Sequence, residues 1–466
     1  MREYNIVTSP ISFLAILEMR KEEEINRHGI MTVTGYISDD SEEKYLRMLT
    51  GDVWEKVEAV GENGDMDILY WGLVTDFFIE RINDQKKLTM EITTGSCLLD
   101  REKHLRSFQD KNISYKQIFR QNCQDYENAA VIFSSPFEEK TGQLVLQYEE
   151  TDWEFFKRLS SRKNKFLVPE SKRMGARIYY DLPKGKKIDF SEEGKYMLGK
   201  DLAVYQKKKN NGLYELKESD CLTYIITSRD NYLIGDYITM QGRNFYVYKI
   251  ISRYTDGEML HEYHLMQEKG LALPTVWLEH ISGCSLDAII KEVKEDKVMV
   301  GILNDENKQQ EINIYYPYAT VYSTPDGTGW YCMPEPGDMV RLTFPGKQEG
   351  EAFVTSSVHV ETESADRKDP DFKVLKTKYQ KEVRFTPNSI VITNNQGTKI
   401  ELTDGEGIHM VSANAVMLEA SEDVTISSDK GSLIVAGTSS VLLKQKGTSI
   451  TLDKGISFTG GELRVQ

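Results

Sequence analysis

The last part of this 466-residue chain, residues 388–466, repeats a short apolar motif that restricts its possible folds more than any other feature. In each repeat two apolar residues flank a third residue, and mainly small, polar or charged residues separate the repeats. Four successive repeats begin at Ile400, Ile408, Val416 and Val424, a constant step of eight residues. The full series is Ile390-Val391-Ile392, Ile400-Glu401-Leu402, Ile408-His409-Met410, Val416-Met417-Leu418, Val424-Thr425-Ile426, Leu433-Ile434-Val435, Val441-Leu442-Leu443, Ile450-Thr451-Leu452 and Ile456-Ser457-Phe458.

These repeats predict a needle wound from three copies of the chain. A three-residue strand with one apolar face cannot bury that face by itself, and the step is too short for a solenoid turn of roughly 20–50 residues. Three chains wound together would each add one strand per layer, with apolar residues inside and every strand edge paired. We therefore expect a homotrimeric triple-stranded β-helix over 388–466. Its core would contain Ile400, Leu402, Ile408, Met410, Val416, Leu418, Val424, Ile426, Ile450 and Leu452.

A single-chain β-sandwich with coincidental spacing is the alternative for this segment. A sandwich needs longer strands and tolerates less regular steps between them. The constant spacing therefore favours the needle.

The first 270 residues predict strands with a few helices. Phe245–Tyr254 and Met259–Leu265 form a hairpin across Thr255-Asp256-Gly257, which is a strong turn signal. Ser114 is positioned to cap a helix that runs through Tyr126, and a second helix begins at Thr151 or Asp152.

A compact β unit follows, with five candidate strands between Thr275 and Thr362 that predict a small barrel. The candidates are Ile289–Val293, Val298–Ile302, Ile312–Tyr316, Met339–Phe344 and Ala352–Val360. The charged run that follows them loses β periodicity and is expected to be a connector.

Composition restricts the partners and the chemistry. The formal net charge is −15, which disfavours nucleic acid and anionic membranes, and we expect Lys207-Lys208-Lys209 to be a solvated loop. The five cysteines form no CxxC pair, so neither a zinc site nor a disulfide framework is expected. The N-terminus has no signal-peptide pattern. We expect synthesis in the bacterial cytoplasm and release by another machine.

Three motifs resemble the VgrG family, the fused hub and spike of contractile injection systems. The first is Leu98-Leu99-Asp100 with Arg106-Ser107-Phe108-Gln109. The second, Tyr148–Leu159, is similar to the family's Tyr-x-Glu-Thr-Asp-x-x-Phe-x-x-Arg-Leu pattern. The third, Pro334–Val340, is similar to the Pro-x-x-Gly-Asp-x-Val start of a strand in the family's OB domain.

The resemblance implies a mainly β fold with four parts. Residues 1–270 would form a hub of two phage-hub-like barrels with helices, 271–365 an OB-fold, 366–387 a connector and 388–466 the β-helical spike. The hub would adapt a six-fold tube to a three-fold needle that punctures a target envelope. The implied partners are an Hcp-like tube protein, baseplate proteins, a PAAR-type tip protein and effector cargo, and no catalytic residue or cofactor is implied.

The sequence leaves two other functions open. One is a trimeric tailspike-type glycan hydrolase or lysozyme, which needs a carboxylate pair and a sugar platform. Residues 388–466 contain neither Trp nor Tyr, and we interpret Glu149, Glu150 and Asp152 as helix-capping residues instead. The other is a binding module whose β-helix only trimerises. His261 and His264 lie in a predicted strand, and His409 is the one histidine of the repeats, so no metal site is expected.

Overall fold

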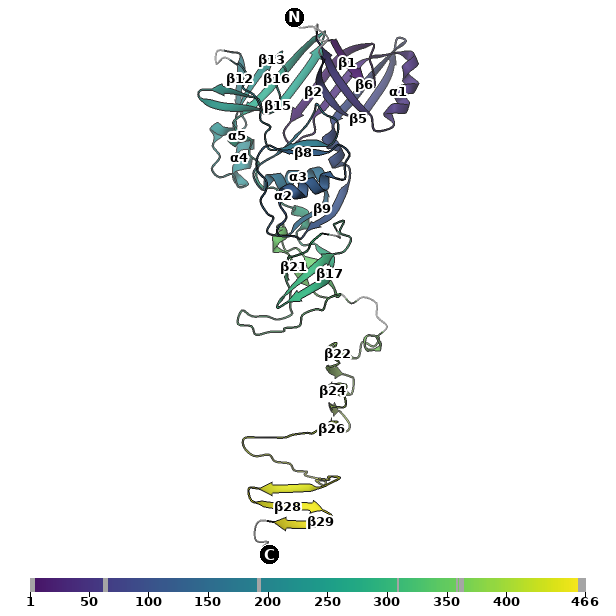
Figure 1. Cartoon of the computed structure of the whole chain (residues 1–466), viewed down its shortest axis with the longest axis vertical. Coiled ribbons are helices and arrows are strands. Elements are labelled where there is room, and N and C mark those ends of the chain that lie inside the picture. Colours follow the sequence, from purple (N-terminus) through teal and green to yellow (C-terminus); the bar gives the residue numbers. More distant parts are fainter. Residues whose placement is uncertain are drawn as a thin grey trace. The chain divides into compact units, whose positions relative to one another are not determined.

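The computed structural model describes residues 5–61, 66–190, 194–307, 310–357, 359 and 364–459 of a mainly β chain. The chain divides into two compact units, residues 1–360 and 361–466 (Figure 1). Within the described residues, no helix is long and apolar enough to cross a membrane.

The first unit begins with an eleven-stranded sheet in the order β1-β4-β5-β6-β3-β2-β15-β16-β13-β12, with β14 paired to β15. Its strands are β1 (Asn5–Ser9), β2 (Ala15–Glu24), β3 (Ile30–Ile37), β4 (Trp54–Val60), β5 (Met66–Ile82), β6 (Gln85–Thr94), β12 (Tyr196–Lys200), β13 (Leu222–Ser228), β14 (Tyr237–Met240), β15 (Arg243–Thr255) and β16 (Glu258–Met266). The strands predicted for the first 270 residues are therefore confirmed.

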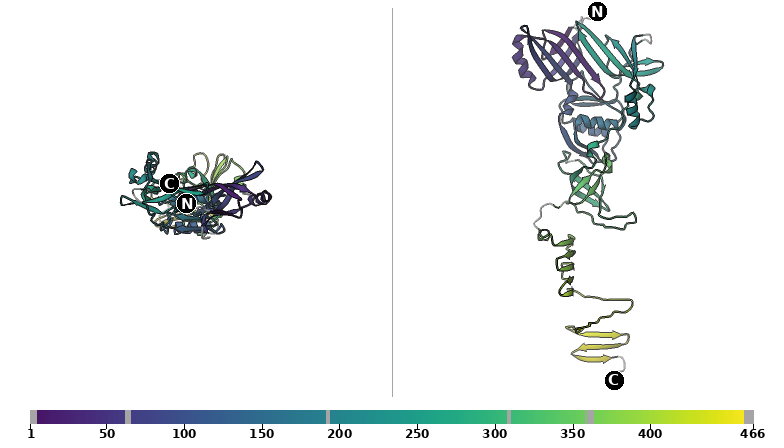
Figure 2. Two further views of the ribbon diagram at one scale, coloured as in Figure 1. Left: turned by 90° about the horizontal axis from the view of Figure 1, so that it is seen from above. Right: turned by 180° about the vertical axis from the view of Figure 1, so that it is seen from behind.

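This sheet forms two lobes, each with its own apolar core. The lobe β1–β6 packs around residues such as Val33 and Met90, and the lobe β12–β16 packs around Ile238 and Val247. The antiparallel pairing of β2 with β15 joins the lobes, which both views show side by side (Figures 1 and 2). In the β15–β16 turn, Asp256 and Gly257 have φ of 51° and 80°, as the predicted hairpin requires.

Helices α2 (Tyr115–Cys123) and α3 (Asp152–Ser161) lie below this sheet in Figure 1. Each starts with a complete capping box, Ser114 with Gln117 and Thr151 with Glu154. Phe119 of α2 stacks on Phe156 of α3 with ring centroids 4.2 Å apart. Small sheets flank the helices: β7 (Lys103–Phe108) with β9 (Val145–Thr151), and β10 (Leu167–Pro169) with β11 (Arg177–Tyr180) and β8 (Ala130–Phe133).

Two helix predictions need correction. The helix capped by Ser114 ends at Cys123, because Gln124 already donates to Gln121 in a tighter closing turn, and does not reach Tyr126. Lys207-Lys208-Lys209 lies in helix α4 (Leu202–Asn210) and not in a loop. Asp201 caps the start of this helix. The three lysines lie in its last turn, where the helix dipole stabilises positive charges. The other α-helices are α1 (Glu42–Leu49) and the short α5 (Glu268–Leu271).

The predicted small barrel is confirmed as a five-stranded sheet in the order β19-β18-β17-β20-β21. Its strands are β17 (Ser285–Lys294), β18 (Lys297–Ile302), β19 (Tyr316–Pro317), β20 (Met339–Thr343) and β21 (Phe353–Thr355). A parallel bridge between Tyr318 and Val354 joins the two ends of the sheet, which gives the connectivity of an OB-fold. The third and fifth strands are shorter than predicted, and Val360 lies outside the described residues.

The second unit contains two antiparallel meanders. The first is β22 (Lys373–Lys376), β23 (Glu382–Phe385), β24 (Ser389–Thr393), β25 (Lys399–Thr403) and β26 (Gly407–Val411). The second is β27 (Val441–Gln445), β28 (Thr448–Asp453) and β29 (Gly455–Thr459). Strands β22 and β23 lie inside the segment that we expected to be a connector. Between the meanders, residues 412–440 form no strand in the single chain, although three apolar repeats fall there.

Candidate functional site

The apolar repeats of the second unit align into rows on one face of the first meander. Across β24 and β25, Ile390 lies opposite Leu402 and Ile392 opposite Ile400. Across β25 and β26, Ile400 lies opposite Met410 and Leu402 opposite Ile408. Since side chains alternate between the faces of a strand, all of these residues share one face.

The second meander repeats this arrangement. Val441 lies opposite Leu452, and Leu443 lies opposite Ile450. The apolar repeats at either end of the predicted needle therefore occupy matched cross-strand positions within one chain.

In the single chain, this apolar face is open to solvent. Of the ten residues expected in the trimer core, Ile450 is partly buried, and the other nine are between 39% and 73% exposed. On β25 the usual burial is inverted, because Lys399 and Glu401 are partly buried while Ile400 and Leu402 are exposed. An apolar face that is this extensive and this exposed normally marks an interaction surface.

The apolar repeats between the two meanders are exposed to solvent as well. Every side chain from 413 to 440 is exposed, including Val416, Leu418, Val424 and Ile426. Within one chain, no described strand brings these four exposed residues together.

The opposite face of the first meander is charged. Lys399 contacts Glu401 at 2.8 Å, and Glu401 lies opposite His409. The two faces therefore differ sharply in polarity, as expected for strands with an apolar inside and a solvated outside.

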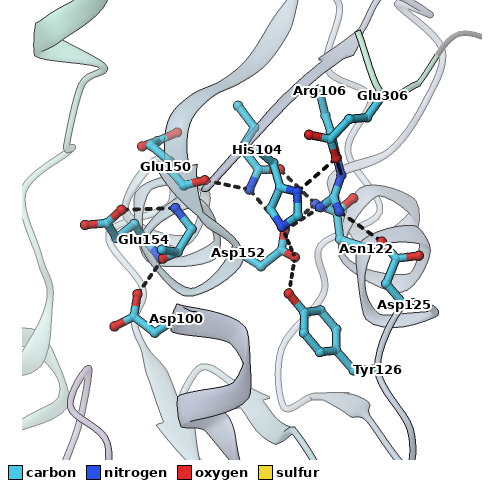
Figure 3. A network of polar contacts seen from close by, with 12 residues as sticks. Asp100, His104, Arg106, Asn122, Asp125, Tyr126, Glu150, Asp152, Glu154 and Glu306 are labelled. Atoms are coloured by element: carbon cyan, nitrogen blue, oxygen red, sulfur yellow. Dashed lines mark hydrogen bonds and ion pairs between the residues drawn. The ribbon is translucent and has the colours of Figure 1, made fainter. Parts of the chain in front are cut away.

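A second set of functional residues lies in the first unit, where Asp152 is fully buried in a polar network (Figure 3). Its Oδ1 accepts hydrogen bonds from Arg106 (2.8 Å), Asn122 (2.8 Å) and Gln147 (3.1 Å). Its Oδ2 accepts a hydrogen bond from the Tyr126 hydroxyl at 2.7 Å. Burial, together with this hydrogen bond to Asp152, raises the pKa of Tyr126.

This network extends into the OB barrel through the loop after β18. The guanidinium of Arg106 contacts Glu306 at 3.1 Å, and His104 Nδ1 contacts the same carboxylate at 2.9 Å. Ser107 donates its backbone amide to Asp305 at 3.0 Å and its hydroxyl to the same side chain. The network therefore links β7 of the hub to the barrel.

A second buried network makes the same connection through Arg158 of α3. Arg158 binds both oxygens of Glu150, at 2.7 and 2.8 Å, and Glu349 of the barrel at 2.7 Å. Arg162 adds two hydrogen bonds to Glu349. Burial alone would raise the pKa of Glu349, but the positive charges of Arg158 and Arg162 outweigh it and lower this pKa. We call the Asp152 and Arg158 networks together the hub clamp.

The hub clamp corrects our interpretation of the acidic residues at the start of α3. Thr151 and Glu154 cap the helix, whereas Glu150 and Asp152 bind buried arginines. Glu149, at the first variable position of the motif, has φ of 54° and lies where the β7–β9 register shifts. Glu149 therefore forms a β-bulge in β9.

The sequence could not identify Asp305, Glu306 and Glu349 as members of the clamp. They lie about 200 residues from their hub partners in the sequence, in loops without any motif. Their partners Arg106, Ser107 and Arg158, by contrast, belong to motifs that the sequence does show.

Several reactive side chains in the first unit are poorly placed for catalysis. His28 lies between Ser96, at 2.8 Å, and Asp100, at 3.3 Å, but Ser96 is fully buried. Burial raises the pKa of the Cys97 thiol to about 11 and that of Cys123 to about 12, which keeps both protonated at neutral pH.

A metal centre has no support within the described part of the chain. No group of three or more His, Cys, Asp or Glu side chains there could hold a metal ion. His261 and His264 lie on strand β16, and His261 bonds Ser252 at 2.7 Å.

The sequence matches no protein-family model and no curated protein, but solved structures share its fold. One is the E. coli c3393 protein, described as a type VI secretion component with structural similarity to the T4 bacteriophage tail proteins gp27 and gp5. It aligns with a TM-score of 0.50 and 12% identity over 75% of this chain and 99% of that chain. A chain of the half-lidded Francisella PdpA–VgrG complex aligns with a TM-score of 0.57 and 11% identity over 88% of both chains. A chain of the lidless PdpA–VgrG complex gives 0.53 and 10% identity, over 85% of this chain and 93% of that chain.

These alignments define the class of fold, which is that of phage-tail hub proteins. More particularly, the fold is VgrG-like, because alignments with chains of the PdpA–VgrG complex extend over most of this chain. At 10–12% identity the likeness concerns the fold alone.

Proposed function

We propose that this chain is the structural spike and hub of a contractile injection machine, such as a type VI secretion system, a phage-tail-like particle or a phage baseplate. In this role it is a homotrimer whose C-terminal segments wind into a needle, and it performs no catalysis. The hub adapts a six-fold tube to the three-fold needle, and sheath contraction drives the needle through a target envelope.

The observation that carries this proposal is the exposed apolar face of the second unit. Its rows extend over both meanders, and its cross-strand alignment is regular. Two further copies would cover the face and supply neighbours for residues 412–440. Winding three chains together also makes unfolding slow, because it requires their separation.

The hub clamp is consistent with this mechanical role. A spike transmits force through the junction between hub and barrel, and this junction is held by buried, charge-assisted hydrogen bonds. The comparisons support the same assignment at the level of the fold.

The proposal includes partners and a location. An Hcp-like tube protein lies above the hub, baseplate proteins surround it, and a PAAR-type tip and effector cargo complete the spike. The chain is made in the bacterial cytoplasm and leaves it with the machine.

Light scattering on the purified full-length chain tests the proposal. One chain is 53.5 kDa, so the trimer has about three times this mass. Ile408→Asp places a charge on the apolar face of β26 and is expected to reduce the trimer population at least tenfold. His409→Asp places the same charge on the opposite face and serves as the control. A monomeric wild-type chain, or equal masses for the two variants, contradicts the proposal.

A further inference from the structure

The loop between β19 and β20 carries a second apolar surface, separate from the needle face. We call residues 318–334 the arm. Figures 1 and 2 show this loop reaching away from the OB barrel near β17. Asp326 is the only charged residue of the arm, in a chain in which 28% of the residues are charged.

The arm has a defined hairpin structure. Ser323 and Gly329 form an antiparallel bridge, Trp330 donates its amide to Tyr322 O at 2.8 Å, and Thr324 donates its amide to Thr328 O at 2.9 Å. At its base, the Tyr331 hydroxyl donates to Glu295 O at 3.0 Å. These bonds hold the arm in one conformation, so its side chains need little further ordering to bind a partner.

The arm presents its large side chains to solvent. Val321, Tyr322, Trp330 and Tyr331 are 90%, 50%, 62% and 76% exposed. Exposed Trp and Tyr side chains on a preorganised support are typical of the centres of protein interfaces. Such a surface in a spike is expected to be covered after assembly.

The rest of the described barrel presents no apolar surface that could cover the arm of another copy. Among the described residues of 277–357, the exposed large apolar side chains are these four on the arm. The turn beside the base of the arm is charged, with Lys294, Glu295 and Lys297. The outer face of the first needle meander is charged as well, and its apolar face would be covered inside the trimer.

We propose that the occupant of the arm is the same arm of a second copy of this chain. In a three-fold assembly one side of each arm contacts the next copy and its other side contacts the previous one, so the contact closes after three copies. The arms then form an apolar cluster at the level of the OB barrels, which holds the trimer together independently of the needle. This inference rests on the proposed trimer but adds a contact outside the needle.

Cys332 provides a direct test, because it lies on the arm and its thiol is exposed. A short bis-maleimide added to the full-length chain is expected to produce covalent dimers and no larger product, because each chain offers one Cys332 thiol and each thiol forms one thioether. Cys332→Ser should abolish these products, whereas Cys284→Ser, which removes a partly buried thiol of the same barrel, should leave them unchanged.

The stability of the trimer is a second readout. Trp330→Ser is expected to lower the guanidinium concentration at which the trimer dissociates, whereas Tyr214→Ser, at an exposed tyrosine of the hub, should not. A trimer by mass without Cys332-dependent products, or with wild-type stability after Trp330→Ser, overturns the arm contact and leaves the proposed function standing. A monomer by mass overturns both.

Discussion

Arg158 and Glu349, 191 residues apart in the sequence, form a buried ion pair with a nitrogen–oxygen distance of 2.7 Å. Arg158 lies in α3, and Glu349 lies in the 3₁₀ turn before β21. This pair, with Glu150 and Arg162, joins the hub to the OB barrel through groups that are almost completely withdrawn from water. Removal of one partner from a buried pair leaves an uncompensated charge, so the junction is sensitive to single substitutions.

Arg158→Met is expected to destabilise the full-length chain by about 3–5 kcal/mol, because Glu150 then stays buried without a cation and Glu349 keeps only Arg162. Unfolding by urea, followed by tryptophan fluorescence, measures the change. Arg101→Met is the matched control. Arg101 pairs with Asp52 at 2.8 Å in an exposed position, and its loss is expected to cost less than about 1 kcal/mol. Equal effects of the two variants would show that the Arg158 pair does not stabilise the junction.

Asp152→Asn tests the other half of the hub clamp. Asparagine has the size of aspartate but no negative charge, and its NH2 group replaces either the oxygen that accepts from Arg106 or the one that accepts from Tyr126, so we expect a loss of roughly 2–4 kcal/mol. Asp125→Asn changes a second carboxylate that binds the same arginine at 2.9 Å, but this carboxylate is exposed. Its expected cost is below about 1 kcal/mol. Thermal unfolding of both variants at the same pH measures their losses of stability. Equal losses would show that the buried carboxylate contributes no more than the exposed one.

The local parts of this clamp could be predicted from the sequence, whereas its long-range parts could not. Ser114 and Thr151 start helices, as predicted, because a capping signal spans only four residues. Glu306 and Glu349 contact the hub only because the OB barrel packs against the start of β9, where Leu146 and the preceding Leu144 belong to the barrel core. No local pattern encodes such packing.

The strands of the needle could also be predicted only in part from the sequence. Periodicity predicted the strands around Ile400 and Ile450, which one chain can pair with itself. It also predicted strands around Val416 and Val424, but these do not form within one chain, where this segment pairs with no other described strand and a short unpaired strand is not stable. Strands β22 and β23 were missed because their charged residues mask the alternation.

Glu55 is expected to make the stability of the folded chain depend on pH. Its side chain is fully buried, Oε2 accepts one hydrogen bond from the Ile11 amide, and Oε1 has no partner among the described groups. Burial raises the pKa of Glu55 to about 8. Between the ordinary pKa of a glutamate and this value, the folded chain holds a proton that the unfolded chain has lost. Stability therefore falls as the pH rises through this window, by at most about 1.4 kcal/mol per pH unit from this group.

Glu55→Gln removes this titration. The variant is expected to gain stability relative to the wild type between pH 5 and pH 8, with the difference increasing toward pH 8 and levelling off above it. Urea unfolding at several pH values measures the difference. Glu43→Gln, at a carboxylate that is 81% exposed, should show no such trend. A pH-independent difference between the Glu55 variant and the wild type would mean that Glu55 is ionised in the folded chain.

Residues 412–440 are expected to gain strand structure only when three chains assemble. Their apolar repeats continue the spacing of β25 and β26, yet every side chain from 413 to 440 is exposed in the single chain. In the trimer, the amides of this segment should exchange with deuterium at least a hundredfold more slowly than in a dissociated chain. Val424→Lys puts a charge at an inward position and should abolish this protection, whereas Thr425→Lys, one residue further and on the opposite face, should retain it. Rapid exchange of this segment in an intact wild-type trimer would mean that the two meanders trimerise separately, with an unwound linker between them.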